Sequence, residues 1–280
     1  MAVTGAVALL VPLAGASSAK TPTRVNTWAP AGTASVHPGV MTNSPSGQCT
    51  ANFVYTDSAG NTYLGQAAHC TSTGGQTDTN GCEADSLPNG TLVEIDGAAH
   101  PGVMVYNSWN AMKAAGETNP DVCQYNDLAL LRLDPADVAN TNPSIPFWGG
   151  PNGVNTAGTV AGDKVYSYGN SSLRFGVTQL SPKSGTSLGT DANGWDHTVY
   201  TATPGIPGDS GSAFLDAQGR ALGILSTLQV APMPGGNGVG DVSREVAYAA
   251  AHGISGLQIT NGTVAFSGGT SVLGLIKLPL

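Results

Sequence analysis

Residues 51–68 run Ala51-Asn52-Phe53-Val54-Tyr55-Thr56, then Asp57-Ser58-Ala59-Gly60-Asn61, and then Thr62-Tyr63-Leu64-Gly65-Gln66-Ala67-Ala68. Two short apolar runs on either side of a Gly/Asn turn predict a β-hairpin. Many short strands without alternating helices predict an all-β protein, built as a barrel or a sandwich rather than from βαβ units. The further runs that indicate strands lie at 91–96, 102–106, 127–133, 158–168, 175–181, 197–203, 211–216, 220–228 and 262–266.

The composition agrees with this fold class and excludes two classes of partner. Charged residues make up 10% of the 280 residues, against roughly 25% in an average domain, and the chain has 39 Gly and 18 Pro. A hydrophobic content of 40% is enough for a sizeable core. With a net charge of −8 and no Lys/Arg cluster, the chain cannot displace counterions from nucleic acid or dock on an anionic membrane.

Two helices and one linker are predicted between the strands. Ser108 would cap a helix at 109–115, and Ser243 would cap a helix at 244–251. The segment 148–157, rich in Gly and Asn, divides the β-rich region into two halves of similar size.

The cysteines predict disulfides rather than a metal site. No C-x-x-C pair occurs, so zinc is not expected. An even number of cysteines in a chain with export features indicates two disulfides, and four cysteines allow three pairings. The cysteines are Cys49, Cys70, Cys82 and Cys123.

The N-terminus predicts export. Residues 5–16 form an apolar run of signal-peptide length, and Ser17-Ser18-Ala19 supplies small residues for cleavage, although no basic residue precedes the run. We therefore assign 1–19 as a signal peptide. The run is too short to cross a bilayer, which needs about 20 apolar residues. Residues 20–48, rich in Pro, Ser, Thr and Gly, would lead into the folded domain.

Three short segments carry residues with catalytic chemistry. A serine hydroxyl is a weak nucleophile at neutral pH, and it needs an imidazole to remove its proton and a buried carboxylate to orient that imidazole. Glycines beside the serine let backbone N–H groups approach a developing oxyanion. Each residue alone has an ordinary structural explanation, so the hypothesis depends on all three segments occurring in order. They are Gln66-Ala67-Ala68-His69-Cys70, Tyr125-Asn126-Asp127-Leu128-Ala129-Leu130-Leu131-Arg132-Leu133 and Pro207-Gly208-Asp209-Ser210-Gly211-Ser212.

These segments resemble the three motifs of the chymotrypsin-like (trypsin-fold) serine peptidases, and in particular the secreted bacterial members. The matching residues are Ala67-Ala68-His69-Cys70, Asn126-Asp127-Leu128-Ala129-Leu130-Leu131 and Gly208-Asp209-Ser210-Gly211. The resemblance covers roughly 40–253. It implies two packed antiparallel six-stranded β-barrels, at 40–150 and 151–253, with a C-terminal helix in the second and an extension at 254–280.

The resemblance also implies the roles of the site residues. Ser210 would be the nucleophile, His69 the general base and then acid, and Asp127 the residue that orients His69. The backbone N–H groups of Gly208 and Ser210 would form the oxyanion hole. In the family, the cysteine after the catalytic histidine pairs with one shortly before it. This implies Cys49–Cys70 and leaves Cys82–Cys123.

The substrate pocket follows from the same resemblance. Ser226 would lie near Asp127, residues 226–228 would pair with the substrate backbone, and Pro204 would lie at the base of the pocket. No charged residue lies at 203–207, so cleavage after Arg or Lys is not expected. Leu225 stands where glutamate-specific relatives have a histidine. Leu228 stands where a glycine usually keeps the pocket open, and it would project into or across the entrance. We therefore expect a small or medium apolar residue before the cleaved bond. The residues assigned to substrate binding are Pro204, Ser226, Thr227 and Leu228.

The chain departs from the family at one buried charge. The activation sequence of the animal relatives, whose freed N-terminus pairs with the aspartate before the nucleophile, is absent. Asp209 therefore needs another cation or hydrogen-bond donors, because an unpaired buried carboxylate is costly. Lys164 and Arg174 are the candidates.

The sequence thus predicts a secreted serine endopeptidase that hydrolyses peptide bonds through an acyl-enzyme. It would need no metal or cofactor, act as a monomer on a protein or peptide substrate, and bind neither nucleic acid nor, in its mature form, a membrane. The main alternative is a catalytically inactive peptidase-like binding protein. An α/β-hydrolase esterase is disfavoured, because there the histidine follows the serine.

Overall fold

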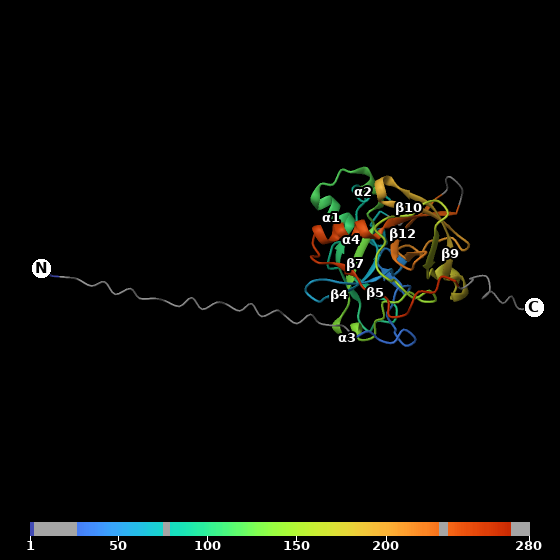
Figure 1. The fold of residues 1–280 in the computed structure, drawn as a ribbon, viewed down its shortest axis with the longest axis horizontal. Coiled ribbons are helices and arrows are strands. Elements are labelled where there is room, and N and C mark those ends of the chain that lie inside the picture. The colour runs from blue at the N-terminus through green and yellow to red at the C-terminus, as the bar shows by residue number, and fades with distance from the viewer. Residues whose placement is uncertain (3–26, 75–78, 230–234, 270–280) are drawn as a thin grey trace, which may run out of the picture.

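The computed structural model describes residues 1–2, 27–74, 79–229 and 235–269. Two antiparallel β-structures lie side by side in Figure 1, with β4, β5 and β7 in one and β9, β10 and β12 in the other. This confirms the predicted all-β, two-part architecture. The predicted signal peptide, 1–19, lies outside the described residues except for its first two.

The C-terminal half is a closed six-stranded barrel, as predicted. Its strand order is β10-β13-β12-β11-β8-β9, and every pair is antiparallel. Its interior contains Val165, Val199, Phe214, Leu222, Leu225 and Val239. The strands are β8 Lys164–Tyr168, β9 Pro182–Asp191, β10 Asp196–Thr201, β11 Ala213–Asp216, β12 Ala221–Gln229 and β13 Gly236–Asp241.

The N-terminal half is an eight-stranded antiparallel sheet with the order β14-β3-β4-β7-β6-β5-β1-β2. It is thus a sheet of eight strands where a six-stranded barrel was expected. One of the additional strands is the short β14, which comes from residues after the C-terminal helix and pairs with the edge of β3. This pairing satisfies backbone groups that a free edge would expose. The strands are β1 Met41–Ser44, β2 Gly47–Thr50, β3 Val54–Thr56, β4 Thr62–Ala67, β5 Leu92–Ile95, β6 Gly102–Asn107, β7 Leu128–Arg132 and β14 Gln258–Ile259.

The predicted hairpin is present as β3 and β4, and its turn is held by Asp57 Oδ1, which accepts from the N–H groups of Ala59 and Asn61. Two strand predictions are wrong. Residues 175–181 form 3-10 turns instead, because Phe175 and Gly176 adopt positive φ angles of 51° and 78°. The strand predicted at 262–266 is also absent, and the segment's Gly262 N–H instead bonds Pro151 O at 2.9 Å.

Both predicted helices form, but each begins one or two residues earlier than expected. The side chain of Asn107, not Ser108, accepts from Trp109 N and Asn110 N at the start of α1, Ser108–Ala115. The side chain of Asp241, not Ser243, accepts from Arg244 N at the start of α4, Val242–Ala251. The other helical segments are α2 Pro120–Tyr125, α3 Pro135–Val138, η1 Ala68–Thr71, η2 Ser172–Arg174, η3 Thr178–Leu180 and η4 Ala192–Gly194.

One hydrophobic core crosses the boundary between the halves. It joins Phe53 and Leu130 of the first half to Leu215 and Ile224 of the second, with Trp148 of the linker among them. Trp148 Nε1 donates to Ser167 O at 2.7 Å, which anchors the linker to β8. The two halves therefore cannot separate without exposing this core, and loops from both meet along a fixed boundary.

The residues after α4 pack on both halves. In addition to β14, Phe266 lies with its ring centroid 5.3 Å from that of Tyr166 on β8. No helix within the described ranges has the length and apolar character needed to cross a membrane.

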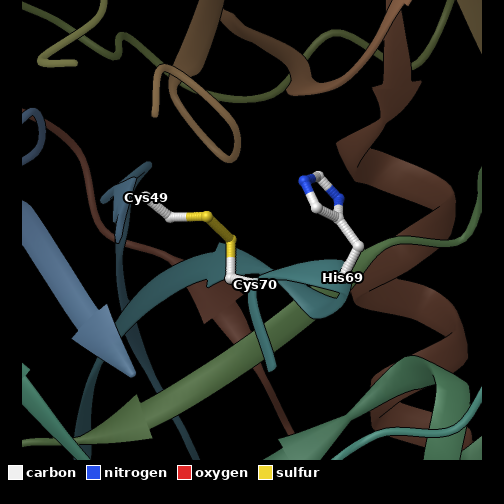
Figure 2. Close-up of side chains that lie close together, drawn as sticks. All are labelled: Cys49, His69 and Cys70. Atoms are coloured by element: carbon white, nitrogen blue, oxygen red, sulfur yellow. A yellow bond between two sulfur atoms is a disulfide. The ribbon is translucent and has the colours of Figure 1, made fainter. Parts of the chain in front are cut away.

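The two disulfides pair as the family resemblance implied. Cys49–Cys70 joins β2 to η1, directly beside His69 (Figure 2). Cys82–Cys123 closes the loop before Asp127 through α2, over a sequence separation of 41 residues. Each therefore constrains the chain next to a residue of the candidate site.

We predict that replacing both Cys82 and Cys123 by Ser costs roughly 3–4 kcal/mol, because the unfolded chain regains the entropy of a long loop. For a protein of this size the melting temperature should fall by roughly 6–16 °C. Thermal unfolding followed by circular dichroism measures this. An unchanged melting temperature in a variant that is natively folded at 20 °C would contradict it.

Candidate active site

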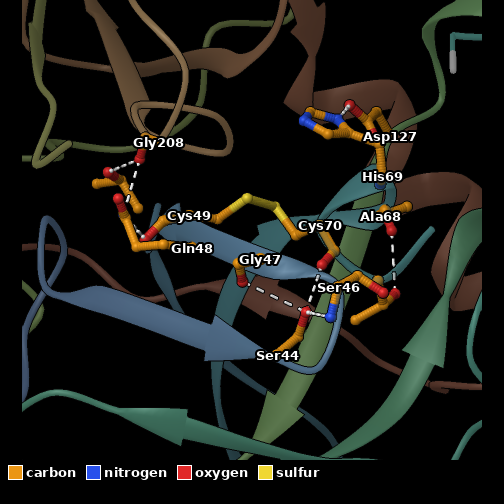
Figure 3. The surroundings of a disulfide bond; sticks show 12 residues. Ser44, Ser46, Gly47, Gln48, Cys49, Ala68, His69, Cys70, Asp127 and Gly208 are labelled. Atoms are coloured by element: carbon orange, nitrogen blue, oxygen red, sulfur yellow. Dashed lines mark hydrogen bonds and ion pairs between the residues drawn. A yellow bond between two sulfur atoms is a disulfide. The ribbon is translucent and has the colours of Figure 1, made fainter. Parts of the chain in front are cut away.

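His69 and Asp127 form a buried pair in the N-terminal half. His69 lies in η1, immediately after β4, and Asp127 lies immediately before β7. The antiparallel pairing of Ala67 with Leu128 brings the two side chains together. His69 Nδ1 lies 2.6 Å from Asp127 Oδ2, and the His69 backbone N–H donates to Oδ1 at 2.9 Å (Figure 3). Both contacts hold the imidazole in one orientation and direct Nδ1–H at the carboxylate.

Residues from the second half complete the surroundings of Asp127. Ser226 Oγ, on β12, donates to Asp127 Oδ2 at 2.6 Å. The structure thus places Ser226 beside Asp127, where the sequence analysis expected it. Asp127 therefore accepts hydrogen bonds from both halves of the molecule.

The charge of Asp127 controls the titration of His69. Burial alone would lower the pKa of His69, but the negative charge of Asp127 and its hydrogen bond to the ring outweigh burial and raise the pKa above its ordinary value of 6.5. A more basic imidazole is a stronger proton acceptor once it is neutral.

Glu245 is a site neighbour that the sequence analysis missed. It lies fully buried on α4, and its Oε1 accepts from the backbone N–H of Asp127 at 2.8 Å. Burial raises the pKa of Glu245 well above its ordinary value of 4.5. Its carboxyl therefore retains a proton at pH values where an exposed glutamate is ionised, and it adds little negative charge behind Asp127. The available signal was that Glu245 is the only acidic residue in the predicted helix 244–251, which is otherwise largely apolar.

The segment that contains Ser210, residues 205–212, lies between β10 and β11 and rests on the N-terminal half. Gly208 O accepts from Gln48 Nε2 at 3.0 Å and from Thr50 Oγ1 at 2.8 Å, and Thr50 N donates to Ser210 O at 2.9 Å. Gly208 has φ +94°, and a Cβ there would lie 2.5 Å from Gln48 Oε1, so only glycine fits. In Figure 3 the Cys49–Cys70 disulfide lies between the Gly208–Gln48 contact and the His69–Asp127 pair.

The backbone next to Ser210 packs closely against the segment of the N-terminal half that carries His69. A Cβ added to Gly211, the next residue, would lie 2.6 Å from Ala67 N, two residues before His69. Ser210 is partly exposed, and its hydroxyl makes no hydrogen bond to any described residue, His69 included. Such bonds are often long before substrate binds. Within the described chain, the N–H groups of Gly208 and Ser210 also donate to no protein acceptor. These two amides are therefore available to an anionic oxygen.

Asp209 is fully buried and is neutralised by two cations. It forms an ion pair with Arg174, one of the two predicted candidates, and its Oδ2 lies 3.0 Å from Lys183 Nζ. The other candidate, Lys164, lies exposed at the start of β8 and forms no ion pair with Asp209. Lys183 was missed, because nothing in Pro182-Lys183-Ser184-Gly185 distinguishes it from a solvent-exposed lysine.

A cavity of about 440 Å³ opens beside Ser210. Three of the predicted substrate-binding residues line it, Ser226, Thr227 and Leu228, whereas Pro204 is not among the lining residues. Leu228 lines the cavity with 55% of its surface exposed. The remaining lining residues, none of them charged, are Thr79, Gly205, Ile206, Pro207, Leu225 and Asn237.

Asn237, on β13, was not anticipated in this cavity. Its Oδ1 accepts from Gly205 N at 2.8 Å, and its Nδ2 lies 3.3 Å from Thr227 O. Its amide thus joins two walls of the cavity. The surrounding Gly-rich segment 235–240 offered no pattern that would identify it.

Two groups of side chains resemble metal ligands by proximity. Cys49, His69 and Cys70 lie close together, but both sulfurs are joined in the disulfide and cannot ligate as thiolates. His100, Asp134 and Asp137 form the other group. There Asp137 accepts from Ala99 N and from His100 N and Nδ1, so local hydrogen bonds already account for its position.

Comparisons with known proteins identify the fold and the family. The crystal structure of Thermobifida fusca Protease A is similar to this chain with a TM-score of 0.51 and 15% identity, over 81% of this chain and 99% of the other. A Glu endopeptidase structure, in complex with MPD, gives a TM-score of 0.51 and 15% identity, over 79% and 92%. No curated protein matches the chain. The family model of the trypsin-like peptidase domain matches residues 52–224, which include His69, Asp127 and Ser210. Because this match covers more than half of the 280 residues, the chain belongs to the trypsin-like peptidase family.

Proposed function

We propose that this peptidase is a secreted serine endopeptidase that cleaves peptide bonds through an acyl-enzyme on Ser210. The observation that carries the proposal is the arrangement at the boundary between the halves. A buried His69–Asp127 pair on one side meets, on the other, a partly exposed serine flanked by two unoccupied backbone N–H groups.

Each step of the reaction has a group to perform it. His69 Nε2 takes the proton of Ser210 as the hydroxyl oxygen attacks the substrate carbonyl carbon. The N–H groups of Gly208 and Ser210 stabilise the resulting oxyanion. His69 then gives the proton to the leaving amine, and the acyl-enzyme remains on Ser210. A water molecule, activated by His69, releases the second product in the same manner. Asp127 stays ionised and stabilises the imidazolium throughout.

Secretion, after cleavage near Ala19, is part of the proposal. The two disulfides support it, because such bonds persist in oxidising compartments and are rare in the cytosol. We propose that the mature enzyme acts as a monomer. We also propose that it needs no metal or cofactor, since Ser210 supplies the nucleophile, His69 the base and two backbone N–H groups the oxyanion donors.

The neutral cavity beside Ser210 supports a preference for apolar residues before the cleaved bond. Leu225, Ile206 and Leu228 supply apolar side chains to this cavity of about 440 Å³, which has room for a side chain of medium size. A buried Arg, Lys or Glu of the substrate would find no opposite charge among the lining residues that the structure describes.

The first prediction from this proposed function concerns the nucleophile. A fluorophosphonate probe should label wild-type protein on Ser210, and Ser210→Ala should lose labelling and several orders of magnitude of kcat. Mass spectrometry of the labelled protein identifies the residue and the mature N-terminus together. A correctly folded wild-type protein that is neither labelled nor active would instead support the inactive binding protein.

The second prediction concerns pH. Only neutral His69 can accept the proton, so kcat/KM should fall as pH decreases through a pKa above 6.5. Asp127→Asn removes the charge that raises this pKa. It should move the acid limb to lower pH and reduce kcat by roughly 10⁴-fold. Asp85→Asn, which alters a carboxylate with 81% of its side chain exposed, is the matched control and should leave the profile unchanged. An unaltered acid limb in Asp127→Asn would refute the assignment.

The third prediction concerns specificity. Peptides that differ only in the residue before the cleaved bond should be hydrolysed fastest when that residue is Ala, Val or Leu. The measurement is kcat/KM across the panel. Faster cleavage after Arg, Lys or Glu would show that the apolar cavity does not select the substrate.

A further inference from the structure

Lys183 is a fully buried lysine whose ammonium group joins two parts of the site. Its Nζ lies 3.0 Å from Asp209 Oδ2, donates to Thr203 O at 3.1 Å and lies 3.4 Å from Pro204 O. An ammonium has three N–H donors, and here each has an acceptor. The side chain reaches these groups from β9, a strand that the proposed mechanism does not otherwise use.

The three acceptors lie at the two ends of one segment. Asp209 stands between Gly208 and Ser210, whose N–H groups are the proposed oxyanion donors. Thr203 and Pro204 lead directly into Gly205–Pro207, which line the substrate cavity. Lys183 therefore connects the residues that lead into the cavity wall to Asp209, which stands between the two proposed oxyanion donors.

Charge balance alone does not account for this lysine. Arg174 already pairs with Asp209, so one buried carboxylate faces two cations. The surplus positive charge is unfavourable in a buried site. Burial and the charge of Arg174 lower the pKa of Lys183 from 10.5 to about 8, against the opposing effect of Asp209. The protonated form of Lys183 is thus disfavoured by folding, and Asp209 already has a cationic partner in Arg174. Neutralisation of Asp209 therefore does not explain the presence of Lys183.

Gly169 packs closely against both Asp209 and Lys183. A Cβ at Gly169 would lie 2.4 Å from Asp209 Oδ1 and 2.9 Å from Lys183 Cε. In the described chain, the charged groups that face Lys183 are Asp209 and Arg174. The flanking strand β8 places the neutral Ser167 opposite it, and Ala202, just beyond β10, bonds the neighbouring Ser184.

We propose that Lys183 is a positioning residue whose ammonium group holds the cavity wall at 205–207, through Thr203 and Pro204, and the oxyanion donors in one arrangement, so that activity declines when this group loses its proton. The inference rests on the proposed peptidase function. A neutral amine has two donors and a lone pair, so at least one of the three acceptors loses its partner. Arg174 still holds Asp209, and the loss of activity is therefore partial.

The test compares kcat/KM between pH 6 and 10 for wild type, Lys183→Met, Lys183→Arg and Lys164→Met. Wild type should show an alkaline limb with a midpoint near pH 8. Lys183→Met should be roughly 10- to 100-fold less active at pH 7 and lack this limb, because displacement of catalytic groups is costly. Lys183→Arg, which keeps its charge, should also lack the limb while retaining more activity than Lys183→Met. The exposed Lys164→Met is the matched control and should behave as wild type.

Thermal unfolding provides a readout that does not depend on activity. Between pH 8 and 10.5 the unfolded lysine holds its proton while the folded one has lost it, so wild type should gain stability relative to Lys183→Met as pH rises. If this gain occurs but Lys183→Met keeps the wild-type kcat/KM and alkaline limb, Lys183 is only structural and the inference is wrong.

Failure of the proposed function is distinguishable from failure of this inference. If wild type neither cleaves peptides nor is labelled on Ser210, the peptidase proposal fails and the positioning role fails with it. If wild type is labelled on Ser210 and the alkaline limb is the same in Lys183→Met, the inference about Lys183 alone is overturned.

Discussion

The hydrogen bonds accepted by the carboxylate of Asp127 are the interactions on which the site depends. Its two oxygens accept from the His69 backbone, the His69 ring and the hydroxyl of Ser226, and its own N–H donates to Glu245. These partners come from η1, from the second barrel and from the C-terminal helix α4. One side chain thus ties three separate parts of the chain to the orientation of a single imidazole.

A second buried carboxylate, Asp209, is accommodated in the opposite way. Asp127 accepts from neutral donors and from His69, and its negative charge raises the pKa of His69. Asp209 is neutralised by Arg174 and Lys183, so it does not place an uncompensated negative charge beside the amides of Gly208 and Ser210. Because charges act strongly over short distances in a buried site, this difference keeps the region of the proposed oxyanion favourable to a developing negative charge.

Most of the architecture was predictable from local patterns. Short apolar runs bounded by turn residues correctly located β4, β5, β6, β7, β11 and β12, because strand formation there agrees with local composition. The pattern failed at β9, where Gly, Ser and Thr dominate and the strand exists because β8 and β10 pair with it on both sides. It also failed at 175–181, where apolar residues lie in turns imposed by positive φ angles. The edge strand β14 is held only by β3, a partner some 200 residues earlier in the chain.

The sequence by itself determined the candidate triad, the fold class and the cysteines that pair, because each is carried by residue types in short contiguous segments that resemble a known family. The tertiary structure decided which partners the buried charged and polar side chains bind. Lys183, Glu245 and Asn237 stand in segments with no distinguishing pattern, and each acts on a group far away in the sequence. Burial is the physical reason. A lysine or a glutamate acquires its altered pKa and its role only when folding removes it from water and fixes the groups that it can bond.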